Sequence, residues 1–125
     1  MIRREHIPII VIVAIVLALS FAVWALKTLG GGPQGDIMQA AFDNDIQMLE
    51  ACVNAGGDVN SLTPEGWTAV MYAASGNNPE AVTFLIRSGA DINIRNDDGK
   101  TALTLAKEKE FDNVVRILES EGAIE

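Results

Sequence analysis

The feature that most constrains this chain of 125 residues is that most of it repeats at an offset of 33. Matches at a single offset over about 90 residues are not expected by chance, and a period of this length predicts similar units that stack into an array. The matching sets are Gly56, Gly89 and Gly122; Ala40, Ala73 and Ala106; Asp58 and Asp91; Asn60 and Asn93; Gly66 and Gly99; and Thr68 and Thr101.

Each unit carries the signals of two short helices. Thr68 and Thr101 are suited to cap the first helix of their units, because a hydroxyl oxygen can accept from the free amides of a first turn. The second helix of the middle unit should start near Pro79, since proline is favoured in a first turn. It should stop at Gly89, which can adopt the left-handed conformation that ends helices.

These motifs resemble the ankyrin-repeat family, whose unit of 33 residues is a β-turn followed by two antiparallel helices. The resemblance implies an all-α solenoid of stacked helix-turn-helix units over residues 36–125, with repeats at about 36–60, 61–93 and 94–125. The motifs that carry it are Thr68-Ala-Val-Met71, Thr101-Ala-Leu-Thr104, Ala40-Ala41, Ala73-Ala74, Gly89-Ala-Asp-Ile-Asn93 and Gly56-Gly-Asp-Val-Asn60.

The first and last repeats have the features expected of terminal units. Repeat one has no preceding loop, and repeat three replaces an alanine by Lys107 in a polar stretch, so we expect a complete array. Two departures from the family pattern concern its proline, replaced by Ala69 and Ala102, and its histidine, replaced by Met71 and Thr104. Because the histidine hydrogen bonds implied by the resemblance are absent, we expect weaker coupling between neighbouring loops and a looser domain.

An apolar segment precedes the repeats. From Ile7 to Leu26, 18 of 20 residues are apolar and none is charged, which is long enough to cross a bilayer as a helix. Arg3 and Arg4 before this segment outnumber Lys27 after it, so residues 1–6 are predicted to be cytoplasmic and the repeats to lie outside. The alternative is a cleaved secretory signal, which would also export the domain.

Two further features concern the predicted membrane helix and the segment that follows it. Ala14, Ala18 and Ala22 are spaced four apart, which is compatible with weak self-association of membrane helices, although alanine is common in such spans. Residues 27–35 are rich in glycine and are predicted to form a flexible linker that keeps the domain close to the membrane.

Composition and residue types exclude several functions. After residue 27 the chain has 16 Asp and Glu against 6 Lys and Arg, which argues against nucleic acid as a partner. The only histidine, His6, precedes the apolar segment, so no histidine-based catalytic or metal site is expected in the domain. Asp97-Asp98-Gly99 is interpreted as a turn rather than a calcium loop. Cys52 is interpreted as a small core residue. We therefore predict no enzyme, no metal and no cofactor.

The remaining candidate site is the surface that the resemblance implies, namely the loop tips and the exposed side of the first helices, which line one groove. Trp67 could anchor a partner or lie flat on the neighbouring loop, and both interpretations stay open. Tyr72 is expected to pack between repeats. The groove is mainly acidic, which favours a protein partner with a basic rim and an apolar centre. The candidate residues are Phe42, Asp43, Leu62, Pro64, Glu65, Trp67, Ser75, Gly76, Arg95, Asp97, Asp98, Lys100, Glu108 and Lys109.

Two functional hypotheses follow. The first is a non-catalytic binding module, anchored in the inner or plasma membrane, that docks one protein partner on the periplasmic or extracellular side. The second, suggested by resemblance alone, is an immunity or protective protein for a toxin or for an exported enzyme such as a catalase. A neighbouring gene for a secreted toxin or peroxide enzyme would favour the second hypothesis.

Overall fold

The computed structural model describes the backbone of residues 8–29 and 33–125, and the side chains of residues 8–23 and 37–125. The chain divides into two units, residues 1–32 and residues 33–125. The predicted cytoplasmic segment 1–6, with Arg3, Arg4 and His6, and the first residue of the apolar segment, Ile7, lie outside the described residues.

The first unit contains one helix, α1 (Ile9–Leu29), of 21 residues. The carbonyl oxygen of Pro8 accepts from the amides of Val11 at 2.8 Å and of Ile12 at 3.3 Å, so the helix begins directly after this proline. The side chains from Ile9 to Val23 are all exposed. The side chains of α1 are described as far as Val23. Among the residues that the structure describes, no helix is both long and apolar enough to cross a membrane.

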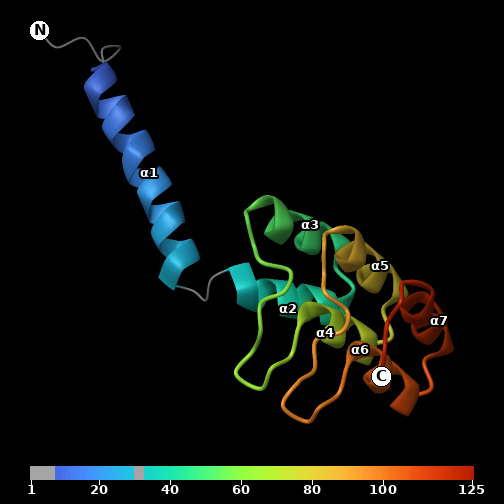
Figure 1. The fold of residues 1–125 in the computed structure, drawn as a ribbon. Helices are drawn as coiled ribbons and strands as arrows, with labels where there is room; N and C mark the ends of the chain where they lie inside the picture. The colour runs from blue at the N-terminus through green and yellow to red at the C-terminus, as the bar shows by residue number, and fades with distance from the viewer. Residues whose placement is uncertain (1–7, 30–32) are drawn as a thin grey trace, which may run out of the picture. The chain divides into compact units, whose positions relative to one another are not determined.

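The second unit is built from helices alone in the residues described, which agrees with the predicted all-α class. Its helices form three pairs, and each pair contributes a first and a second helix to the array (Figure 1). The first helices are α2 (Pro33–Asp43), α4 (Ala69–Ser75) and α6 (Ala102–Glu108), and the second helices are α3 (Ile46–Asn54), α5 (Pro79–Arg87) and α7 (Asp112–Ser120).

The six helices form two layers. The inner layer consists of α2, α4 and α6, which lie side by side, and the outer layer of α3, α5 and α7 packs behind it. Two long loops extend to the same side of the inner helices: the first finger, residues 57–68, and the second finger, residues 90–101 (Figure 1). Contacts between neighbouring inner helices are more extensive than those between neighbouring outer helices. The outer helices therefore pack less closely against one another than the inner helices do.

Small side chains explain the close packing of the inner layer. The alanines that repeat along the sequence are almost completely buried, because they line the contacts between neighbouring helices. Cys52 is 5% exposed and belongs to the same core, as expected for a small apolar residue. The buried alanines are Ala40, Ala41, Ala69, Ala73, Ala74, Ala102 and Ala106.

The predicted helix signals are confirmed. The hydroxyl oxygens of Thr68 and Thr101 each accept, at 3.3 Å, from the amide three residues further on. Helix α5 begins at Pro79, and Gly89 follows its end with φ of +93°, in the left-handed region. Local signals in the sequence therefore determine where these helices begin and end.

The linker predicted at 27–35 differs from the structure at both of its ends. Helix α1 continues through Lys27 to Leu29, and α2 begins at Pro33, three residues before the predicted start of the repeats at Asp36. Lysine and leucine are good helix formers, and proline fits the first position of a helix, so these residues extend the flanking helices. Only residues 30–32 separate the two, and they lie outside the described residues.

Candidate functional site

The predicted site residues gather on the two fingers and on the exposed ends of the inner helices, a surface named here the inner face. Leu62, Pro64 and Glu65 lie exposed in the first finger, and Arg95, Asp97 and Asp98 lie exposed in the second. Phe42, Asp43, Glu108 and Lys109 are exposed on the inner helices or directly after them, whereas Trp67, Ser75, Gly76 and Lys100 are half-buried.

The two fingers are fastened to each other. The amide of Asp97 donates to the carbonyl oxygen of Glu65 at 3.1 Å. Gly66, with φ of +78°, makes this approach possible, because a Cβ there would lie 3.0 Å from the Asp97 carboxylate and 3.2 Å from the Asp97 amide nitrogen. Each finger is also closed internally, by Thr63 N–H to Trp67 O at 3.0 Å and by Asn96 N–H to Lys100 O at 2.9 Å. The fingers therefore present a defined surface.

Trp67 forms a ring pair with Tyr72. The ring centroids are 5.2 Å apart and the planes are inclined by 45°, a favourable aromatic arrangement. Both side chains are half-buried and pack against the core. Trp67 thus connects the first finger to α4 and is only half-buried there.

An apolar pocket of about 300 Å³ lies on the inner face between α2 and α4. Met38, Gln39, Phe42 and Tyr72 line it, and Phe42 is 48% exposed. The Asp43 carboxylate accepts from the Gln39 amide nitrogen Nε2 at 2.8 Å beside it. Sequence reasoning named Phe42 but missed Met38 and Gln39, although residues 38 and 42 are one helical turn apart and share a face.

The predicted cations of the inner face are engaged within the domain. Lys100 Nζ contacts the Glu108 carboxylate at 2.8 Å, and this hydrogen bond raises the pKa of Lys100 above its ordinary value. Lys109 Nζ donates to the Ser75 hydroxyl at 2.8 Å and to the Ser75 carbonyl oxygen at 3.1 Å. Arg95 donates to the Gly99 carbonyl oxygen at 2.9 Å and also to the Glu125 carbonyl oxygen.

The predicted acids on the finger tips are free of such pairing. Within the described part of the chain, the carboxylates of Glu65, Asp97 and Asp98 take part in no ion pair. Because the cations nearby are already engaged, the accessible charge of the inner face is mainly negative, as the sequence indicated.

Asn78 and Lys109 join neighbouring repeats, a role that sequence reasoning missed. The Asn78 amide nitrogen Nδ2 donates to the carbonyl oxygens of Ala41 at 3.0 Å and Phe42 at 2.5 Å. Lys109 makes the corresponding contact with Ser75 at the next junction. Gly76 leaves room for the first bridge, because a Cβ there would lie 2.8 Å from Asn78 Nδ2. The sequence offered no local signal for this bridge, because asparagine at the start of a helix indicates a cap, and Asn78 makes no capping hydrogen bond.

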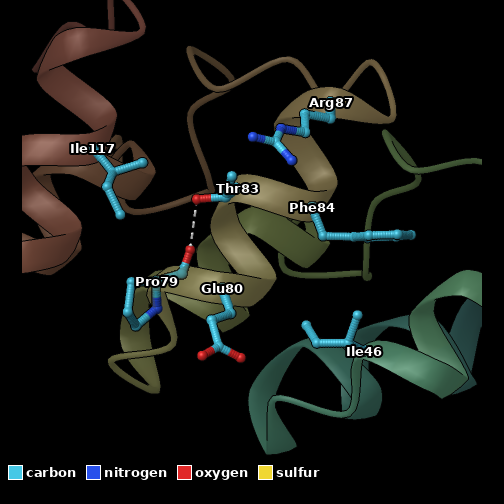
Figure 2. A pocket seen from close by; sticks show the side chains of 7 residues that line it. All are labelled: Ile46, Pro79, Glu80, Thr83, Phe84, Arg87 and Ile117. Carbon is cyan, nitrogen blue, oxygen red and sulfur yellow. Dashed lines mark hydrogen bonds between the residues drawn. The ribbon is translucent and has the colours of Figure 1, made fainter.

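A second, shallow pocket of about 470 Å³ lies on the outer face (Figure 2). Helix α5 contributes most of its lining, while Ile46 comes from α3 and Ile117 from α7. In Figure 2, Glu80 and Arg87 extend from opposite ends of α5, with Thr83 and Phe84 between them. None of these residues was predicted as part of a site.

Comparison with known families assigns the repeats. The model described as ankyrin repeats, in three copies, matches residues 37–124. No curated protein matches the chain. The family match covers well over half of the chain, and the helix pairs, fingers and caps described above correspond to it. This chain therefore belongs to the ankyrin-repeat family.

Proposed function

We propose that this chain is a membrane-tethered binding module that holds one protein partner on its inner face, on the periplasmic or extracellular side of the membrane. Ankyrin repeats in general serve as non-catalytic modules for protein-protein interaction. The observation that carries the proposal is the half-exposed Phe42 ring in an apolar pocket beside a mainly acidic surface.

The arrangement of the inner face supports a protein as the partner. Binding sites commonly combine a small apolar centre with a polar rim, and aromatic side chains supply much of their binding energy. Phe42, Tyr72 and Trp67 provide apolar area, while Glu65, Asp97 and Asp98 provide accessible negative charge. A partner with an apolar centre and a basic rim complements this surface best.

The tether is supported by the apolar segment 7–26 and by the helical conformation of α1. As a continuous helix, the 20 residues of this segment would span about 30 Å at ~1.5 Å per residue, comparable with the apolar thickness of a bilayer. The arginines at positions 3 and 4 favour a cytoplasmic N-terminus. A reporter enzyme fused after Glu125 tests this orientation, since activity only in the cytosol would overturn it.

Site-specific photocrosslinking in intact cells tests the binding site. A photoreactive phenylalanine analogue at position 42 should form an adduct with the partner, whereas the same analogue at Gln47, exposed on the outer helix α3, should not. With the analogue at position 62 instead, the substitution Phe42→Asp should abolish the adduct. Equal adducts from both faces, or an adduct that survives Phe42→Asp, would contradict the proposal.

A further inference from the structure

The outer face carries a charge pattern that the proposed binding function does not use. Glu80 and Arg87 are exposed, line the same pocket and lie seven residues apart on α5. This spacing corresponds to two turns, or a rise of about 10.5 Å, along one face of a helix. In the described part of the chain, neither side chain takes part in an ion pair.

Only the middle repeat has this pattern. At the offset of 33, Glu80 corresponds to Gln47 in α3 and Asn113 in α7, while Arg87 corresponds to Asn54 and Ser120. The neighbouring outer helices are thus neutral where α5 carries one charge of each sign. Glu80 in the first turn of α5 and Arg87 in its last turn also interact favourably with the helix dipole. The experiment that tests the dimer separates this stabilising role from binding.

The residues between the two charges offer apolar contact area. Phe84 and Thr83 lie midway along this face, and Ile46 and Ile117 flank it from α3 and α7 (Figure 2). Phe84, Ile46 and Ile117 are only partly buried although they pack against the core. The α5 face, defined as Glu80, Thr83, Phe84 and Arg87, therefore has an apolar centre with an opposite charge at each end.

We propose that the α5 face binds the α5 face of a second copy of this chain, in a symmetric dimer with the two helices antiparallel. A two-fold axis places residue i of one copy against residue j of the other and the reverse. An axis near the midpoint of positions 80 and 87, between Thr83 and Phe84, sets Glu80 of each copy against Arg87 of the other. The same arrangement brings the two Phe84 rings to the centre.

Self-complementarity favours a second copy over a different protein. Glu80 and Arg87 lie at equal distances from the centre of the α5 face. Two antiparallel copies therefore place opposite charges against each other, whereas two parallel copies would place like charges against each other. The net negative charge of the domain repels a second copy at long range, so the dimer is expected to be weak and to depend on these two short-range pairs.

Charge reversal on the full chain in detergent micelles tests the dimer. Light scattering measures the mass of the protein component between about 1 µM and about 1 mM, a range that spans weak and moderate association. Wild type should reach the mass of a dimer within this range. Glu80→Arg and Arg87→Glu should each raise the concentration at which the dimer forms at least tenfold, and the double variant should return that concentration to the wild-type value. Ser120→Glu, the matched change on α7, should leave that concentration unchanged.

The double variant distinguishes binding from helix stability. Its reversed charges oppose the dipole of α5, so its melting temperature should stay below that of wild type even though dimerisation returns. A monomer at every concentration, or a failure of the double variant to restore dimerisation, would overturn the proposal. A dimer unaffected by the single reversals would do so as well, and would assign association to another part of the chain such as α1.

Discussion

The bridge from Asn78 to repeat one should make a measurable contribution to stability, and Asn78→Ala removes it alone. The Asn78 side chain precedes α5 but makes no capping hydrogen bond to that helix. Its amide nitrogen instead donates to the carbonyl oxygens of Ala41 and Phe42, at the end of α2. Alanine at this position therefore loses this one bridge between repeats one and two without losing a helix cap.

The expected loss follows from the two hydrogen bonds. Each contributes about 0.5 to 1.5 kcal/mol, and leaving the Ala41 carbonyl oxygen, which lies in the partly buried bond of the two, without a donor adds to the cost, so we expect about 2 kcal/mol. For a domain of roughly this size, about 1 kcal/mol changes the melting temperature by ~4 to 8 °C. The expected decrease is thus about 8 to 16 °C. In a linear array this loss falls on the contact between two neighbouring units.

Urea unfolding followed by circular dichroism measures this effect. Asn54→Ala, the same change at an exposed position at the end of α3, serves as the control and should alter the free energy of unfolding by less than about 0.5 kcal/mol. If Asn78→Ala costs no more than the control, the bridge does not couple the repeats, and the reasoning is refuted.

Three further predictions concern single positions. Glu110 has φ of +57°, as do Asn44 and, within a degree, Asn77 at the equivalent turns; Glu110→Asn should raise the free energy of unfolding by about 0.5 kcal/mol, because asparagine tolerates this conformation better, and an unchanged value would contradict it. Cys52 should react with a thiol reagent only after unfolding, since it is buried, and rapid reaction of the folded chain would be inconsistent with the core position. The hydrogen bond from Lys107 lowers the pKa of Glu125, so their contact should persist until the pH falls below the range in which a glutamate carboxyl ordinarily titrates, which a nuclear magnetic resonance titration of the Glu125 carboxyl checks. A titration at the ordinary pKa would show that the contact does not form in solution.

The periodic positions of the fold could be read from the sequence because each is governed by a local rule. The caps formed by Thr68 and Thr101 involve only amides three residues away, and the end of α5 requires only that Gly89 adopt a positive φ angle. The extent of α2 was less predictable, since the glycines at 30–32 and 35 masked the helix start at Pro33. A proline after a glycine-rich segment permits either a turn or a helix, and tertiary packing decides between them.

The sequence predicted which residues belong to the candidate site but not which groups their side chains contact. Lys100, Lys109 and Arg95 were named as surface residues, yet the structure engages each with another part of the domain. Such partners lie up to 34 residues away in sequence, and a period of 33 shows which positions are equivalent without showing which side chains reach across. The pocket around Phe42 was missed for the same reason, because α2 and α4 meet only in the folded array.

The contacts between repeats show which side chains link neighbouring units in a chain that lacks the histidine of the family pattern. At the positions of that histidine, Met71 is buried in the core, and the Thr104 hydroxyl lies 3.1 Å from that of Thr101. The links between repeats come instead from Asn60, Asn78, Asn93 and Lys109, which bind backbone groups of the next or previous unit. Hydrogen bonds of this kind require no compensating acid. The carboxylates of the finger tips therefore take no part in the links between repeats, and the binding of a basic surface that we propose would not weaken those links.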